Sequence, residues 1–399
     1  PPEQTVADVQ IAMIQHGIHH LCITKTGSTD AAVIGVISEH DLLVVQGNDP
    51  AILIREIQRA THPDQLKQYS QKANSLLYKY LYQEVSIAFI SKIIAQINDA
   101  ITRKAIIIAT DEMAQNDHRS PAVGFCWMAL GSAGREEQLL HTDQDSALVF
   151  EDVAAEDYET TKAWFLALAK RVTGILDHCG FEYCPADMMA SNSSWCLSIS
   201  EWKSQFEQWI ISPSEKNVMF CTIFFDYRPI FGKKELSEQL TDHIYKLLDK
   251  ESRFLTFLAK NALENPPPLT FFRNFVVEKG GEDKDRFDIK ARAMMPLADA
   301  ARLLILNAKQ PGINNTFRRF DQMAILEENN KELFEQAADA YEILIRYRTM
   351  QGLRNTNSGR YIQPDVLTKM ERLNLRNSFR PIHALQDLLK VRFRTNLVF

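Results

Sequence analysis

The chain has 399 residues, a length that predicts about two to four domains. Hydrophobic residues make up 45% of it, charged residues 24%, and the formal net charge is −6. This acidic balance argues against a general nucleic-acid-binding protein, although one basic pocket could still bind a small anion. No apolar run has the length of a membrane span and no signal peptide is visible, so the expected location is cytoplasmic. The chain opens at Pro1 without a Met, so we expect a piece of a longer protein.

The six cysteines form no CxxC pair, and several lie in apolar runs. This pattern predicts reduced thiols in the core and argues against a zinc site. They are Cys22, Cys126, Cys179, Cys184, Cys196 and Cys221.

Residues 1–60 read as a small α/β unit with the order helix, strand, strand, helix. Thr5 is a plausible N-cap for the first helix, which Gly17 then ends. Strands are predicted at His20–Thr24 and Val33–Ser38, with turn residues between them, and a second helix begins at Asp41.

This order resembles a CBS module, a small domain that usually occurs in pairs and binds adenine nucleotides. The segment Gly35–Leu43 matches the strand, turn and helix that close such a module. The resemblance implies that Ser38 and Asp41 contact the phosphate and ribose of a regulatory adenine nucleotide. The usual pairing of modules implies a homodimer. The alternative interpretation of Ser38 and Asp41 is a solvated helix cap, and the sequence leaves both open.

Residues 61–120 carry apolar side chains at three- and four-residue steps, with no Gly or Pro between Gln65 and Pro121. The pattern predicts two helices that connect a regulatory part to a catalytic part.

Residues 121–235 change to the short apolar runs typical of a mixed α/β domain. Buried strands are predicted at Val123–Leu130 and Ser146–Phe150, on either side of a Gly-rich turn. The later elements are a helix at Glu156–His178, a strand at Phe181–Cys184, a helix at Ser200–Ile211 and a strand in the apolar run Val218–Phe225.

Residues 236–399 read as a helical bundle, interrupted at Pro266–Pro268 and at Gly280-Gly281. Helices such as Ala291–Leu306 and Lys331–Tyr347 carry the pattern. The predicted fold class is therefore α+β and multidomain, with the boundaries 1–60, 61–120, 121–235 and 236–399.

The turn that follows the strand predicted at Val123–Leu130 has the composition of a phosphate-binding loop. Gly131 and Gly134 allow a sharp bend and a close approach to a ligand. Ser132 can donate its hydroxyl to a phosphate oxygen, and a helix that begins here points its free N–H groups at the same anion. Arg135 can contact phosphate or fix the turn through a carboxylate.

Two carboxylates, Asp143 and Asp145, open the next strand. Residues two apart on a strand project from the same face, about 6–7 Å apart along the chain. Such a pair repels unless a cation lies between the two, and Mg²⁺ prefers hard oxygen ligands with water and phosphate completing its shell. The Gly-Ser turn followed by Asp-x-Asp therefore predicts a metal site beside a triphosphate site.

This arrangement resembles the DNA polymerase β-type nucleotidyltransferase superfamily, whose signature is a Gly-Ser turn followed by Asp-x-Asp. It is more similar to the bacterial uridylyltransferases and adenylyltransferases of nitrogen regulation. It is most similar to a family of signal-transduction nucleotidyltransferases in which CBS or cyclic-nucleotide modules precede the domain. The matching positions are Gly131, Gly134, Arg135, Glu137, Asp143 and Asp145.

The resemblance covers most of residues 63–399 and implies that the C-terminal helical domain binds substrate. Ser132 stands where the uridylyltransferases have a second Gly, which is closer to the wider superfamily. No His-Asp phosphohydrolase motif with supporting histidines is visible, so a built-in reversing hydrolase is not expected.

A third metal-binding carboxylate on a later strand is also implied by the superfamily. Asp226, at the end of an apolar run and followed by Arg228, is the candidate. An acid there needs a cation or a donor, and an ion pair with Arg228 is the alternative. The run 288–297 matches one typical of the family's C-terminal domain, and Lys290 and Arg292 within it could face nucleotide or substrate, with a solvated helix start as the alternative. Most of Arg318, Arg319, Arg346 and Arg348 are expected to be surface charges.

The predicted reaction is the Mg²⁺-dependent transfer of a nucleoside monophosphate from ATP or UTP to an acceptor hydroxyl on a protein or small molecule. Asp143, Asp145 and Asp226 would hold two Mg²⁺ ions, with Mn²⁺ as a substitute, and Asp226 could accept the acceptor's proton. The nucleotide-binding residues would be Gly131, Ser132, Gly134, Arg135, Glu137, Arg228 and Lys290. The alternatives are a non-catalytic nucleotide sensor and, disfavoured by the charge, a tailing enzyme that acts on nucleic acid.

Overall fold

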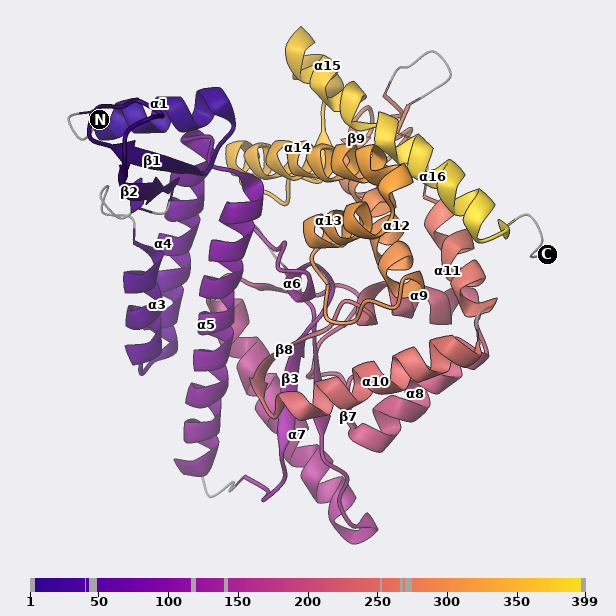
Figure 1. Cartoon of the computed structure of the whole chain (residues 1–399). Coiled ribbons are helices and arrows are strands. Elements are labelled where there is room, and N and C mark those ends of the chain that lie inside the picture. Colours follow the sequence, from indigo (N-terminus) through magenta and orange to yellow (C-terminus); the bar gives the residue numbers. More distant parts are fainter. Residues whose placement is uncertain are drawn as a thin grey trace.

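A computed structural model of the chain describes residues 4–39, 41–42, 49–115, 120–139, 143–251, 253–265, 268–269 and 275–395. The architecture is mixed α+β and mostly helical, with small sheets and a helical C-terminal region (Figure 1). The predicted fold class is confirmed at this level.

The N-terminal unit begins with α1 (Val6–His16). The Thr5 side chain accepts a hydrogen bond from the N–H of Asp8 in a capping box, and Gly17 ends the helix in the left-handed region with φ 60°. Strands β1 (His20–Thr24) and β2 (Val33–Ser38) pair antiparallel. These elements were predicted, but a two-stranded unit does not establish a CBS module. The helix predicted from Asp41 falls mostly outside the described residues.

Three helices connect this unit to the rest of the molecule. They are α3 (Pro50–Arg59), α4 (Pro63–Tyr82) and α5 (Ile87–Gln115), and they pack along one another (Figure 1). The two predicted connector helices are confirmed as α4 and α5. The third, α3, was not predicted, although Asp49 caps it and Pro50 occupies its first turn.

The predicted catalytic region, residues 121–235, is built on a four-stranded sheet with the order β7-β5-β3-β8. Strand β3 runs antiparallel to β5 and to β8, and β5 runs parallel to β7, so the sheet is mixed, as predicted. Every residue of β5 is buried, which explains its continuous apolar sequence. The strands are β3 (Phe125–Ala129), β5 (Ser146–Phe150), β7 (Cys196–Ser198) and β8 (Arg228–Gly232).

Three helices pack around this sheet. They are α7 (Ala155–His178), α8 (Ile199–Ile211) and α10 (Lys234–Lys250). The first two match the predicted helices to within a few residues.

The prediction of a strand at Val218–Phe225 is wrong. The segment forms α9 (Glu215–Phe224), and the Ser214 side chain caps it by accepting from the N–H of Asn217. Phe220 and Phe224 are four residues apart, and both pack on Trp195 with ring centroids 5.2 and 4.5 Å away. The apolar run is therefore one side of a buried helix, which a short run cannot distinguish from a strand.

The C-terminal region is helical, as predicted. A turn of π-helix at Lys290–Met294 leads into α12, and α14 continues beyond the predicted end. Its α-helices are α11 (Arg253–Leu263), α12 (Met295–Asn307), α13 (Thr316–Leu326), α14 (Lys331–Asn355), α15 (Lys369–Ser378) and α16 (Arg380–Arg392).

Helix α14 connects the C-terminal region to the junction between α4 and α5. Glu342 accepts a hydrogen bond from the N–H of Ile87 at 2.9 Å. Arg346 donates to the carbonyl of Val85 at 2.7 Å. One helix therefore contacts both the connector and, through its other residues, the site described below.

All six cysteines are free thiols, and all but Cys22 are buried, as predicted. None of the helices in the described ranges combines the length and the apolarity needed to cross a bilayer.

Candidate active site

The turn that follows β3 forms the short helix α6 (Gly131–Gly134). Gly131 has φ +53°, a conformation that favours glycine. A Cβ on Gly134 would lie 1.6 Å from the backbone oxygen of Asp226, so only glycine fits. The two glycines are required here by backbone geometry and by close packing.

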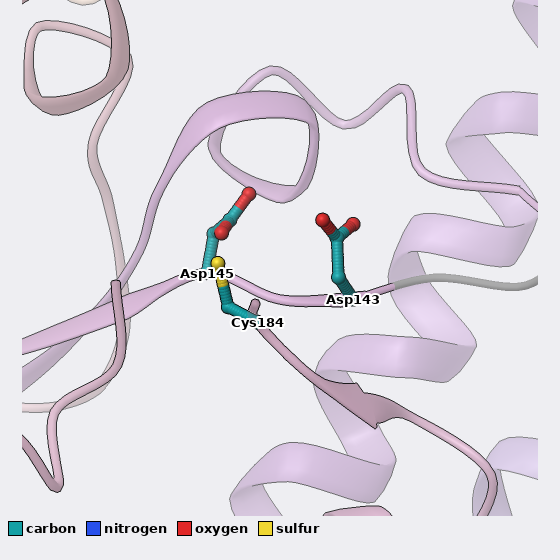
Figure 2. Close-up of side chains that lie close together, drawn as sticks. All are labelled: Asp143, Asp145 and Cys184. Carbon is teal, nitrogen blue, oxygen red and sulfur yellow. The ribbon is translucent and has the colours of Figure 1, made fainter. Parts of the chain in front are cut away.

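Asp143 and Asp145 lie beside this turn. Asp143 belongs to β4 (Asp143–Gln144), which pairs parallel with β6 (Glu182–Tyr183), and Asp145 lies between β4 and β5. Figure 2 shows both carboxylates on the same side of the chain, with the sulfur of Cys184 beside Asp145. One ligand atom from each of these three residues lies within 4.8 Å of the others. The predicted juxtaposition of the two carboxylates is therefore present.

The electrostatics of the pair oppose the ionised form of Asp145. Burial and the neighbouring charge of Asp143 raise the pKa of Asp145 to about 6. Burial and the charge of Asp145 raise the pKa of the Cys184 thiol to about 11. At neutral pH the site thus holds two carboxylates at close range and a protonated thiol.

This donor set fits Mg²⁺ or Mn²⁺. Two carboxylates supply hard oxygen ligands, and their mutual repulsion is the feature that a divalent cation relieves. The protonated Cys184 thiol is a soft group that Mg²⁺ does not favour, so the fit rests on the two aspartates.

A pocket lies between the catalytic region and the C-terminal helices. Ser132, Arg135 and Asp143 line one side of it, and Lys290 and Arg348 line the other. Lys290 has no hydrogen-bond or ion-pair partner among the described residues, and burial lowers its pKa despite the charges of Asp143 and Asp145. Burial also lowers the pKa of Arg348, whose Nε donates to the carbonyl of Ser358 at 3.1 Å. Two desolvated cations therefore face the carboxylate pair.

Arg135 and Glu137, both predicted to bind nucleotide, fix the turn in place. The Nε of Arg135 donates to Glu137 at 2.8 Å. Glu137 also accepts from the hydroxyl of Tyr341 at 2.8 Å and from the N–H of Thr316 at 2.5 Å. The carboxylate of Glu137 is buried and fully used by these donors, whereas Arg135 still lines the pocket.

Asp226 does not join Asp143 and Asp145. Its carboxylate is 0% exposed and accepts hydrogen bonds from three arginines. Arg135 donates at 2.8 Å, Arg302 at 3.0 and 2.6 Å, and Arg319 at 2.7 Å. Burial alone would raise the pKa of Asp226, but the three guanidinium groups hold that pKa far below its usual range.

The position of Asp226 changes the predicted ligand set. Within the described ranges, the one group of three or more side chains placed to share a metal ion is Asp143, Asp145 and Cys184. The structure thus gives Asp226 a place in a buried ion network, and no third carboxylate of the described residues belongs to the 4.8 Å cluster of Asp143 and Asp145. The alternative, an ion pair with Arg228, is not formed either.

Arg228, predicted to contact nucleotide, binds the connector. Its guanidinium makes two hydrogen bonds to Asp99 on α5, at 2.7 and 2.9 Å, and a third to the carbonyl of Ala133 at 3.2 Å. It ties α5 to the α6 turn and does not line the pocket at Asp143.

Ser38 and Asp41 hydrogen-bond to each other. The N–H and hydroxyl of Ser38 each donate to the Asp41 carboxylate at 2.8 Å, and the N–H of Asp41 donates to the Ser38 hydroxyl at 3.3 Å. This is the geometry of a helix cap, the alternative considered for these residues.

The expectation that most of the four C-terminal arginines are surface charges needs correction. Arg318 is exposed and Arg346 is half-buried, but Arg319 is 2% exposed and Arg348 lines the pocket. Reasoning from sequence also missed Arg302 and Tyr341. A charge inside the apolar run around Arg302 was a signal of a buried partner. Tyr341 carried no such signal.

Comparison with known families gives two matches. Residues 71–216 match a family described as "Putative nucleotidyltransferase DUF294". Residues 252–393 match one described as "Putative nucleotidyltransferase substrate binding domain". No curated protein matches the chain. The first match contains the α6 turn and the aspartate pair, and the second contains Lys290 and Arg348.

Proposed function

We propose, on the premise that both matches place this chain with the nucleotidyltransferases, that it transfers a nucleoside monophosphate from a nucleoside triphosphate to an acceptor hydroxyl and releases pyrophosphate. The observation that carries the proposal is a pocket that Asp143 lines together with two desolvated cations, Lys290 and Arg348, with the Asp145 carboxylate next to Asp143. Binding of a polyphosphate requires carboxylates that hold a divalent cation and cationic side chains that bind the phosphate oxygens.

The charges support a triphosphate as the ligand. Asp143 and the adjacent Asp145 offset Lys290 and Arg348, and Glu137 offsets Arg135, so the site is close to neutral without a metal ion. A bound divalent cation makes it about +2, which suits the highly charged phosphate chain of a nucleoside triphosphate. Lys290 and Arg348 would bind the β- and γ-phosphates, and the hydroxyl of Ser132 would donate to a phosphate oxygen.

Mg²⁺, with Mn²⁺ as a substitute, would be held by Asp143 and Asp145, and it would supply neutralisation of phosphate charge and activation of the acceptor hydroxyl. The acceptor oxygen attacks the α-phosphorus in line, the bond from that phosphorus to the oxygen bridging to the β-phosphate breaks, pyrophosphate leaves and the hydroxyl proton passes to solvent water. Asp226 is removed from the predicted role of proton acceptor, because its carboxylate is buried and saturated by arginine donors. Its proposed role is to hold Arg135 and the turn.

The test uses purified protein, triphosphates labelled on the α-phosphate, Mg²⁺ and a cell extract as the acceptor source. We expect label to be transferred by the wild type, and we expect Asp143→Asn and Asp145→Asn each to lower transfer by about a thousandfold or more, since each removes a metal ligand. Asp157→Asn, at an exposed aspartate in the first turn of α7, is the matched control. Full activity in either of the first two variants would refute the assignment.

The base preference and the acceptor follow from the same assay. Competition between ATP and UTP identifies the nucleotide, and mass spectrometry of the labelled product identifies the acceptor. Binding of the triphosphate without pyrophosphate release, under all acceptor conditions, would favour the non-catalytic sensor.

A finer proposal concerns the N-terminal unit, where the CBS resemblance suggests a regulatory adenine nucleotide. It is supported by a cavity that Ser38 and His19 line together with Lys92 of α5 and Arg318 of α13. Titration of the full chain with AMP and ADP is the test, with Ser38→Ala and Lys92→Ala expected to weaken binding. Unchanged affinity in both variants would reject this ligand site.

A further inference from the structure

A second pocket lies on the opposite side of the α6 turn. We call it the back pocket and define it by Glu136, Tyr227, Tyr245, Leu306, Arg318 and Arg319. It shares no lining residue with the pocket at Asp143. Residues of the turn and those just after it contribute to different pockets: Ser132, Arg135 and Glu137 line the pocket at Asp143, while Gly134 and Glu136 line the back pocket. The back pocket is thus separate from the pocket at Asp143, and it shares Glu136, Asn315 and Arg318 with the cavity beside Ser38.

Arg319 brings an unused donor to the back pocket. Its side chain is 2% exposed, its Nε donates to the carbonyl of Ile313 at 2.8 Å and its Nη2 donates to Asp226 at 2.7 Å. Its Nη1 is buried without a hydrogen-bond partner among the described residues. A buried charged donor without an acceptor destabilises the unliganded protein, so a ligand oxygen that accepts from this donor gains affinity.

The rest of the lining indicates the kind of acceptor. Arg318 is exposed, and its guanidinium has no hydrogen-bond or ion-pair partner among the described residues, so a second cation is available next to Arg319. Tyr227, Tyr245 and Leu306 supply aromatic and apolar walls. Two acidic residues, Glu136 and Glu238, also line the back pocket. Glu238 pairs with Lys234 at 3.3 Å and Glu136 interacts with the charge of Arg228, so each already has a cation near it.

We propose that the back pocket binds a small organic anion, in which an aromatic or apolar body carries a phosphate or carboxylate group. The anionic group is held by Arg318 and by Nη1 of Arg319, and the body packs on the two tyrosines and Leu306. This site is distinct from the proposed triphosphate site and does not depend on catalysis.

The test is calorimetric titration of the full chain with four probes. Phenyl phosphate and phenylacetate carry both the body and an anion, whereas inorganic phosphate and phenol each carry one of them. We expect at least one of the first two probes to bind with a dissociation constant of about 1 mM or tighter, and the last two to bind at least about tenfold more weakly. Whichever aromatic anion binds better identifies the preferred headgroup.

Variants locate the bound probe. Arg318→Ala should weaken binding about tenfold or more by removing a charge-assisted hydrogen bond, and Gln310→Trp should abolish it by filling the pocket. Lys290→Ala, in the other pocket, and Arg253→Ala, at an exposed arginine of α11, should leave probe binding unchanged. Circular dichroism checks the fold. Because Arg318 also lines the cavity beside Ser38, Lys92→Ala, which changes that cavity alone, should leave probe binding unchanged, and this pair of variants is the test if Gln310→Trp does not fold.

Two results would overturn the proposal. One is the absence of binding by both aromatic anions at concentrations up to about 10 mM. The other is binding that Lys290→Ala removes and Arg318→Ala leaves intact, which would place the probe in the pocket at Asp143.

Discussion

Asp145 has an environment that favours metal binding at the expense of stability. Burial and Asp143 raise its pKa from 3.8 to about 6, so the folded protein binds a proton more tightly than the unfolded chain does. The folded state therefore loses stability as pH rises from below 4 through about 6, and at neutral pH the cost is fully present. A divalent cation between the carboxylates would remove it.

We therefore expect Asp145→Asn to be more stable than the wild type in EDTA at pH 7, by about 1–3 kcal/mol, although it lacks activity. Urea denaturation from pH 4 to 8 measures the difference, which should be small at pH 4 and grow until about pH 7. Added Mg²⁺ should stabilise the wild type alone. A variant less stable than the wild type in EDTA would contradict this account of the site.

Asp226 has the opposite balance, because three arginines stabilise its charge. Asp226→Asn leaves the buried Arg319 without a carboxylate partner, whereas Arg135 keeps Glu137 and Arg302 keeps Asp299. We expect a loss of about 3–5 kcal/mol in the free energy of unfolding. Urea denaturation measures this loss, with Asp157→Asn as the control. A variant that keeps wild-type stability and loses only Mg²⁺ affinity would restore the predicted role as a metal ligand.

The contrast between these aspartates shows what the sequence could predict at the level of single residues. Asp143 and Asp145 follow a glycine turn within a dozen or so residues, so their pattern is local. The partners of Asp226 are 76, 91 and 93 residues away in the chain. No periodicity or spacing connects such distant residues, and the apolar run before Asp226 is equally compatible with a metal site and with a buried ion network.

The α6 turn depends on close packing between two segments. A Cβ at Gly134 would overlap the backbone oxygen of Asp226, which cannot move without disturbing the arginines around its side chain. We expect Gly134→Ala to destabilise the protein by about 2 kcal/mol or more and to abolish transfer.

Gly174 provides the matched control for that variant. It lies inside α7, and a Cβ there would meet only the Tyr183 hydroxyl at 3.8 Å. Gly174→Ala should stabilise the helix by about 0.5–1 kcal/mol and leave transfer unchanged. Thermal denaturation of both variants tests the pair, and equal effects would contradict the proposed packing.

Among the elements, those with clear boundaries in the sequence were predicted well. Strands β1, β2 and β5 have the predicted limits, because turn residues or charges flank them. Helix α9 was missed because its apolar residues contact aromatic rings from distant segments, which the run itself does not reveal. The Ser214 cap was the available signal against a strand.

At the scale of the molecule, the two halves share their buried charges. Glu137 and Asp226 lie before residue 252, whereas Tyr341, Arg302 and Arg319 lie after it. We expect a fragment ending at Glu251 to lack a cooperative unfolding transition, since Asp226 would lose two of its three arginine partners and Glu137 would lose its hydrogen bonds from Thr316 and Tyr341. Circular dichroism and gel filtration of that fragment provide the measurement. A fragment that is compact and unfolds cooperatively would show that the halves fold independently.

The fold class and the order of helical and mixed regions could be predicted from composition and periodicity. The packing of the C-terminal helices against the α6 turn could not, because it depends on single contacts such as that between Tyr341 and Glu137. The pocket that holds Lys290 and Arg348 opposite the aspartates is a product of that packing.

Helix α14 contacts the α4–α5 junction through Glu342 and Arg346 and also lines this pocket through Arg348. Six residues separate Glu342, which holds the start of α5, from Arg348, a distance of about 9 Å along a helix. A regular helix transmits a displacement along its axis with little loss. A shift of the α4–α5 junction by an ångström would therefore move the Arg348 guanidinium by a similar amount relative to the aspartates, so an upstream event could alter phosphate affinity without unfolding any loop.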